Sequence, residues 1–212
     1  MQKKINILIS SVGGQGGLSL SRMIAEASAI KGYRITTGEI LGMAQRFGSV
    51  LSFVRIGINE EVYSPIFSKG EADYLLCLEL FECVRSLSYL KFGGWVITST
   101  EVKPPISASL EGKKQVEKVP SYLEVIRKHS EGNLISIEPK LVKEVVGTLR
   151  AINATVLGAF IMLSGVFDDD AALEGIRKVL KSERAIEISK KAYNIGKSIA
   201  EKAMPIHADN KS

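Results

Sequence analysis

Short apolar runs alternate along the chain with longer segments of helical periodicity. The runs are rich in β-branched residues and are bounded by glycine, proline or polar clusters, which is typical of strands. They predict strands at residues 4–10, 34–37, 49–58, 73–78, 95–99 and 134–137. We expect the third of these to continue as a hairpin or meander through residues 61–64 and to end at Pro65.

Helical periodicity follows the first strand directly. Gly32 stands where a C-terminal cap belongs, after apolar residues at i, i+3, i+4, i+7 and i+10: Leu20, Met23, Ile24, Ala27 and Ile30. The same periodicity predicts further helices at residues 81–90, 122–129, 140–150, 154–165, 171–181 and 184–203.

The order of these elements predicts the fold class. Strands that alternate with helices favour an α/β protein, here a Rossmann-like three-layer α/β/α sandwich with a mostly parallel sheet. Residues 34–64 interrupt the rhythm, so we expect some antiparallel strands there. No linker or internal repeat divides the chain, which predicts a single domain over residues 1–204 and a polar tail over 205–212.

Composition and charge exclude several classes of protein. The chain has 212 residues, of which 45% are hydrophobic, and a formal net charge of +5. Its lysines are interspersed with acidic residues, as on solvated helix faces, and no nucleic-acid-binding motif is present. No apolar stretch is long enough to span a membrane or to form a signal peptide, so we expect a cytoplasmic protein.

A glycine-rich turn follows the first strand and is the strongest candidate site. Gly13, Gly14, Gln15 and Gly16 come directly after a buried strand and before a helix, where backbone N–H groups can face an anion. The spacing fits neither common nucleotide fingerprint, because Ser11 replaces the first glycine of G-x-G-x-x-G and no P-loop lysine follows. We therefore expect cofactor or phosphate contacts here without naming the ligand.

A second polar segment, residues 38–49, contains Glu39, Gln45 and Arg46. If the ends of the first two strands lie close together, this segment faces the glycine turn across one crevice. Arg46 would then favour a phosphate or carboxylate, and Gln45 a neutral polar group. The alternative is a loop packed on the sheet edge, with Arg46 in an ordinary salt bridge. Glu39 also stands at the spacing of a nicotinamide ribose carboxylate, which keeps a dinucleotide site open.

Other candidates for chemistry have simpler explanations. Asp168, Asp169 and Asp170 precede a helix, where capping and favourable charge are commoner than a metal site. His129 and His207 have no nucleophile or ligand set nearby, so surface positions are expected. No metal site is predicted and no catalytic residue can be assigned.

Several motifs together resemble the gamma-type (catalytic-domain III) family of 2-oxoacid:ferredoxin oxidoreductases. The glycine turn at residues 11–16 is followed by residues 39–50, with the sequence EILGMAQRFGSV, and by 54–57. Further likenesses are residues 63–65, 71–73 and 89–94, Asn153 with 157–159, and 193–196, so the resemblance runs from residue 5 to about 203.

Two residues depart from that family's pattern. Ser11 stands where the family usually has glycine, and Phe47-Gly48 where it has a glycine pair. These departures bear on any ligand-binding role carried over from the family, because Phe47 would narrow the crevice or alter a partner contact.

The resemblance implies a subunit of an enzyme that oxidatively decarboxylates a 2-oxoacid, an aryl-pyruvate such as indolepyruvate. Such enzymes use thiamine diphosphate, coenzyme A and 4Fe-4S clusters, and pass electrons to ferredoxin. This chain has no thiamine diphosphate motif, and its two cysteines, Cys77 and Cys83, are too few for a cluster. A large alpha subunit would supply both, and this chain would be inactive alone. The alternatives are a stand-alone NAD(P)-binding oxidoreductase and a non-catalytic binding module.

Overall fold

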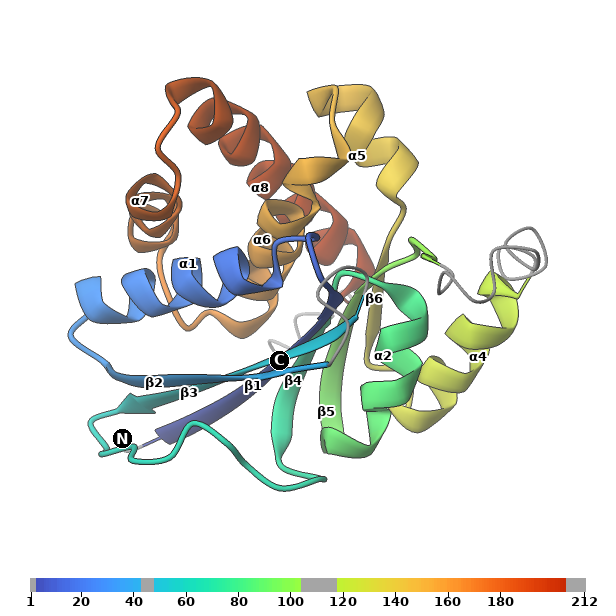
Figure 1. Ribbon diagram of the computed structural model, residues 1–212, viewed down its shortest axis with the longest axis horizontal. Helices are drawn as coiled ribbons and strands as arrows, with labels where there is room; N and C mark the ends of the chain where they lie inside the picture. The colour runs from blue at the N-terminus through green and yellow to red at the C-terminus, as the bar shows by residue number, and fades with distance from the viewer. Residues whose placement is uncertain (1–2, 43–47, 104–117, 205–212) are drawn as a thin grey trace, which may run out of the picture.

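The computed structural model describes residues 3–42, 48–103 and 118–204, which form one six-stranded sheet with helices on both faces (Figure 1). The strand order is β2-β3-β1-β4-β5-β6. The strands are β1 (Lys3–Val12), β2 (Arg34–Leu41), β3 (Ser49–Ile58), β4 (Ala72–Cys77), β5 (Leu90–Ser99) and β6 (Leu134–Ile137).

Strand β1 lies inside the sheet and sets its mixed topology. It pairs antiparallel with β3, from Lys3 opposite Ile58 to Val12 opposite Ser49, and parallel with β4 on its other edge. Strands β4, β5 and β6 continue in parallel, and β2 pairs antiparallel with β3. The predicted combination of a parallel sheet with some antiparallel strands in residues 34–64 is confirmed.

Helices cover both faces of the sheet in three layers. One face carries α1 (Gly17–Ile30), α6 (Ile152–Ser164), α7 (Asp169–Val179) and α8 (Glu183–Ala203). The other carries α2 (Leu80–Ser86) and α4 (Val119–His129). Successive residues of β1 serve the two layers, because Ile7 and Ile9 pack under α1 and α6 while Leu8 packs under α2. The predicted three-layer α/β/α sandwich is confirmed.

The structure corrects three strand boundaries. Strand β2 extends to Leu41 rather than ending at residue 37, and β5 begins at Leu90 rather than at residue 95. Residues 61–64 form no strand. Since β3 is already paired on both edges, the chain turns away at Asn59, which has a φ of 54°, and Pro65 then packs over Gly38.

The predicted helix at 140–150 is shorter than expected. Helix α5 (Pro139–Val146) ends at Gly147, whose φ of 78° is a left-handed cap, and a 3₁₀ turn at Leu149–Ala151 leads into α6. In the described residues no single helix is long and apolar enough to cross a membrane. The pair Pro139–Val146 and Leu149–Ser164 passes by length and composition only, with a bend of 113°.

Helices α6 and α8 approach so closely that glycine is required on both. A Cβ atom at Gly158 would lie 2.0 Å from the carbonyl oxygen of Tyr193, and one at Gly196 would lie 1.9 Å from that of Thr155. Both obstacles are backbone atoms inside helices, which cannot move aside cheaply. The same contact seats the buried Tyr193, whose hydroxyl donates a 2.7 Å hydrogen bond to Asp169.

We expect Gly196→Ala to destabilise the protein by about 3 kcal/mol, because overpacking against backbone outweighs the better helix propensity of alanine, about 1 kcal/mol. Urea unfolding measures the change. Ser198→Ala, at an exposed position of the same helix, is the matched control and should stay within about 0.5 kcal/mol. A Gly196→Ala variant as stable as the wild type would contradict this account of the α6–α8 contact.

Candidate functional site

The carboxyl end of β1 lies at a topological switch point. After β1 the chain enters α1 on one face of the sheet, and after the neighbouring β4 it enters α2 on the other (Figure 1). Such a position leaves a crevice outside the strand ends, where α/β proteins bind ligands. The glycine turn at residues 13–16 occupies this position, as the sequence predicts.

The second polar segment reaches the glycine turn by an unexpected route. Strand β2 does not neighbour β1; instead, the antiparallel β3 begins beside the end of β1, with Ser49 opposite Val12. The amide of Gly13 consequently donates a 2.9 Å hydrogen bond to the carbonyl of Gly48. The glycine turn and Gly48 of the second polar segment therefore meet at the carboxyl end of β1. We call this place the switch-point corner.

The turn itself offers backbone donors. Gly14 and Gly16 have φ values of 91° and 90°, a conformation that strongly favours glycine. In the described part of the chain the amides of Gly14, Gly16 and Gly17 donate to no acceptor. Because these amides stand at the N-terminus of α1, the local charge distribution suits an anion.

Gln15 holds the turn in place. Its side chain is buried, its Oε1 accepts a hydrogen bond from the amide of Val12 at 2.9 Å, and its Nε2 donates to the carbonyl of Leu78 and to Glu101, each at 3.1 Å. These bonds tie the turn to the ends of β4 and β5. The side-chain amide of Gln15 is thus fully engaged within the protein, and this geometry gives it the role of positioning the glycine turn.

Asn153, at the start of α6, is a polar residue of this corner that the predicted site did not include. An ideal Cβ at Gly16 would lie 2.9 Å from its Nδ2. Its Oδ1 accepts from the amide of Ala154, whereas its NH₂ group donates to no acceptor in the described residues. The residue is 92% buried. Its signals in the sequence are its place in the family likeness and its position as an asparagine inside an apolar helix.

The remaining predicted residues lie apart or outside the described chain. Glu39 is exposed on β2, with β3 between it and β1, so it does not occupy the neighbouring-strand position of a ribose carboxylate. Gln45 and Arg46 lie outside the described residues, as does Phe47. The turn, Gly48 and Asn153 are what the structure brings together.

Ser11 is buried directly beneath the start of α1. An ideal Cβ at Gly17 would lie 2.4 Å from Ser11 Oγ and 3.2 Å from Ser11 Cβ. A serine side chain at position 11 is therefore accommodated because position 17 is glycine. Beyond Ser11 the nearest atom to that Cβ is Ile9 Cγ2 at 3.7 Å, an ordinary van der Waals distance.

This contact predicts a strong coupling between positions 11 and 17. Gly17→Ala should cost about 1–3 kcal/mol of unfolding free energy through overpacking. In a Ser11→Gly background the same change should cost less than about 0.5 kcal/mol, because the obstructing atoms are gone. A double-mutant cycle measured by chemical denaturation gives the coupling energy; a value near zero would show that the two side chains do not compete for this space.

Glu79 anchors the loops beside the turn. It is fully buried at the N-cap of α2, where it accepts hydrogen bonds from the amide of Glu82 at 2.5 Å and from that of Lys103 at 3.0 Å. Burial raises the pKa of this carboxyl, and the backbone donors offset part of the effect. An acidic residue directly after a buried strand is the sequence signal for such a cap.

The raised pKa of Glu79 makes stability depend on pH. The native state keeps the proton above the pH at which the unfolded state, with an ordinary pKa of about 4.3, releases it. The unfolding free energy of the wild type minus that of Glu79→Gln should thus fall as the pH rises from about 4.3 through the raised native pKa. Denaturation at a series of pH values measures this difference, and a flat or rising difference would contradict it.

The structure also bears on several other expectations. Asp168 caps α7 by accepting a 3.0 Å hydrogen bond from the amide of Ala171, and His129 is exposed at the end of α4, as predicted. His207 lies outside the described residues. Cys77 is buried and its pKa is raised by burial. Over residues 3–42, 48–103 and 118–204 no cluster of His, Cys, Asp or Glu could hold a metal ion.

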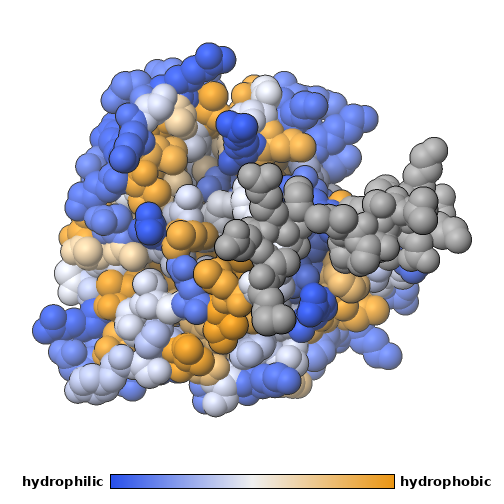
Figure 2. Space-filling model, in the orientation of Figure 1, coloured by the Kyte–Doolittle hydropathy of each residue, from blue (hydrophilic) through white to orange (hydrophobic). Residues whose placement is uncertain are grey.

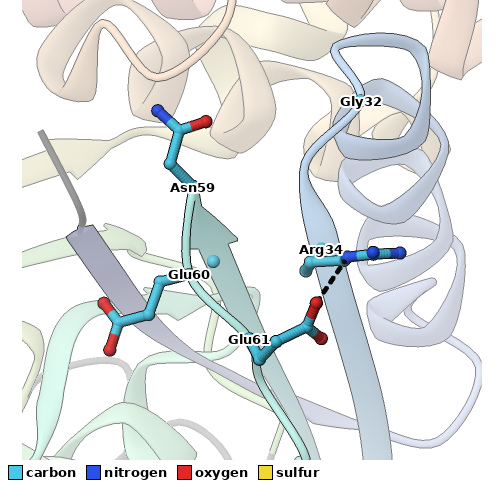
Figure 3. Close-up of a pocket in the computed structure, with 6 residues that line it drawn as sticks. Gly32, Arg34, Asn59, Glu60 and Glu61 are labelled. Atoms are coloured by element: carbon cyan, nitrogen blue, oxygen red, sulfur yellow. Dashed lines mark ion pairs between the residues drawn. The ribbon is translucent and has the colours of Figure 1, made fainter.

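A large open pocket lies at the other end of the sheet, lined by Gly32, Arg34, Gly57 and residues 59–61 (Figure 3). Its charged side chains are paired, Arg34 with Glu61 at 3.0 Å and Lys4 with Glu60 at 2.7 Å. It therefore adds no free charge for a ligand, and the switch-point corner remains the candidate site.

The fold and this corner define an α/β protein whose glycine turn presents backbone donors at the switch point of a mixed sheet. The family model described as pyruvate ferredoxin/flavodoxin oxidoreductase matches residues 6–199, and the chain belongs to this family of oxidoreductases.

Curated relatives agree with this assignment, and a solved structure shares the fold. The chain is 28% identical to indolepyruvate oxidoreductase subunit IorB of Thermococcus kodakarensis, over 95% of this chain and 98% of the relative. It is 31% identical to the IorB subunit of Archaeoglobus fulgidus, over 91% and 94%. The fold matches that of a 2-oxoglutarate:ferredoxin oxidoreductase from Magnetococcus marinus, with a TM-score of 0.70, 17% identity, and coverage of 96% of this chain and 32% of that one.

Proposed function

We propose that this chain is the smaller subunit of a cytoplasmic, heteromeric 2-oxoacid:ferredoxin oxidoreductase. Its substrate is indolepyruvate or a related aryl-pyruvate, which the assembled enzyme decarboxylates oxidatively with coenzyme A, passing electrons to ferredoxin. The observation that carries the proposal is the similarity to four archaeal IorB subunits, at 28–31% identity over at least 90% of this chain. Residues 1–204 would act as one domain of that complex.

The cysteine content of the chain supports a division of labour between subunits. A 4Fe-4S cluster normally requires four thiolates, and this chain has two cysteines in all, both buried. We therefore assign the clusters, together with thiamine diphosphate, to a large alpha subunit. In the Magnetococcus marinus enzyme a match to this fold covers about a third of one longer chain, so the same fold occurs there with further polypeptide attached.

Residues of this chain would line the substrate or coenzyme A side of the shared site. The amides of Gly14, Gly16 and Gly17 and the NH₂ group of Asn153 are donors without an acceptor among the described residues, which fits a phosphate or carboxylate. Coenzyme A, when bound, supplies the thiol that accepts the acyl group. This chain's contribution would be to orient such a ligand and to hold water away from it.

Exposed apolar residues near the corner would form a contact surface for the large subunit. Ile40, Leu41 and Ile66 are 44%, 66% and 50% exposed, at the end of β2 and in the loop that packs against Gly38. Figure 2 shows the same side of the molecule as Figure 1. Hydrophobic surface gathers there over the region in which Figure 1 places β2 and β3. Such a patch is typical of a protein–protein interface.

The nicotinamide alternative lacks this kind of support. It depended on Glu39 beside the glycine turn, and β3 separates the two strands concerned. A non-catalytic module that has kept the fold would show the same structure; only activity of the assembled complex separates it from the proposed subunit.

Reconstitution tests the proposal. The purified chain should not reduce ferredoxin with indolepyruvate and coenzyme A, whereas the complex co-expressed with a cluster-bearing large subunit should. Leu41→Glu should reduce association with that subunit at least tenfold, because it places a charge in an apolar interface. Analytical ultracentrifugation measures the association, and ferredoxin reduction measures the activity.

Val125→Glu provides the matched control, since Val125 is an exposed aliphatic residue on α4, in the layer away from α1 and α8. It should leave association unchanged. Turnover by the isolated chain, or a complex with no activity towards any aryl-pyruvate, would overturn the proposed function. Equal effects of Leu41→Glu and Val125→Glu on association would show that the apolar patch is not part of the interface.

A further inference from the structure

A second pocket opens beside the glycine turn, between the start of α6 and the start of α8. Its volume is about 480 Å³. The polar side chains that line it are two arginines, three hydroxyl residues and one amide: Arg150, Arg184, Thr148, Ser182, Ser189 and Asn153. The pocket shares Asn153 with the glycine turn, because that side chain also lies against Gly16.

The charge that lines this pocket is entirely positive. Among the described residues, Arg150 and Arg184 are its only charged lining residues, and no carboxylate lines it. In the described part of the chain neither guanidinium forms an ion pair or a side-chain hydrogen bond, and both arginines are exposed. Two unpaired guanidinium groups at one opening favour an anion.

Two donors on largely buried residues of the pocket also lack partners among the described residues. Ser189 is 94% buried, and its hydroxyl makes no hydrogen bond within the described residues. Asn153 is nearly as buried, and its NH₂ group donates to no acceptor in residues 3–42, 48–103 and 118–204. Both donor atoms stay accessible from the pocket, because Ser52 Oγ is the one fully buried side-chain atom without a partner among the described residues, so both are available to a ligand.

The N-terminus of α8 adds to these donors. This helix has 21 residues, and its N-cap, Ser182, does not cap it with its side chain. The first-turn amides of such a helix point out of its start, where Ser182, Arg184 and Ala185 line the pocket. Glu183 stands in the same turn but does not line the pocket.

We propose that this pocket binds a phosphate group of a small phosphorylated ligand. Guanidinium, hydroxyl, amide and helix N-terminal donors converge there, and a phosphate with three terminal oxygens can accept from more of them than a carboxylate can. Arg150 and Arg184 supply the charge, and Ser189 and Asn153 supply hydrogen bonds from inside. The assignment follows from the pocket's own chemistry and does not depend on the proposed function.

Isothermal titration calorimetry of the full-length chain with inorganic phosphate, ADP and coenzyme A tests this. The wild type should bind at least one of the three. Arg150→Ala and Arg184→Ala should each weaken that binding about tenfold, and the double variant about a hundredfold. Arg127→Ala removes the same charge from an exposed position on α4 in the opposite layer and should leave binding unchanged.

Ser189→Ala provides a second variant that removes a single neutral donor, and it should weaken binding several-fold. Circular dichroism establishes that each variant is folded. Equal affinity for all three probes would indicate a site for phosphate alone, and tighter binding of ADP or coenzyme A would indicate a nucleotide ligand.

Three results would overturn the proposal. They are no binding of any probe to the folded wild type, undiminished binding by the double arginine variant, and competition by succinate as effective as that by phosphate. Because the titration uses no large subunit and no 2-oxoacid, its failure would leave the proposed function standing. Loss of the proposed function would likewise leave a phosphate site in place.

Discussion

The pairing of β1 with strands of opposite direction is the constraint on which the rest of the structure depends. Its antiparallel partner β3 brings the end of a hairpin to the carboxyl end of β1, and its parallel partner β4 sends the chain to the other face of the sheet. Both consequences fall at the glycine turn. One buried strand thus creates the switch point. It also brings the backbone of Gly48 beside the turn, where the amide of Gly13 donates a hydrogen bond to its carbonyl.

Close backbone approaches hold the helical layer against that corner. Gly16 admits the side chain of Asn153 from α6, and Gly17 admits Ser11 from β1. Helix α6 is in turn fixed against α8 through Gly158 and Gly196. Since native interiors are close-packed, a methyl group at any of these positions would shift the backbone of the turn. The site's geometry is therefore distributed through the α1, α6 and α8 layer rather than stored in the turn alone.

Hydrophobic periodicity was sufficient to predict the three layers, all six strands and the Asp168 cap, because these follow from local pattern and capping chemistry. It could not reveal that β3 lies between β1 and β2, since strand order depends on pairing between distant residues. That order separates Glu39 from the turn. Asn153 was missed as a site residue for a similar reason. Its signals were a place in the family likeness and a polar residue in an apolar helix, and neither shows that it lies against Gly16.

The motif residues divide into two groups once their contacts are known. Gln15, Tyr193 and Gly196 are engaged in holding the fold together, through the turn, the Asp169 hydrogen bond and the helix crossing. Asn153 and the amides of Gly14 and Gly16 are left as donors without acceptors in the part of the chain that the structure describes. A chain that presents donors at a corner bordered by exposed apolar residues, and holds too few thiols for a cluster, is suited to orienting a ligand whose reacting group lies in a neighbouring subunit.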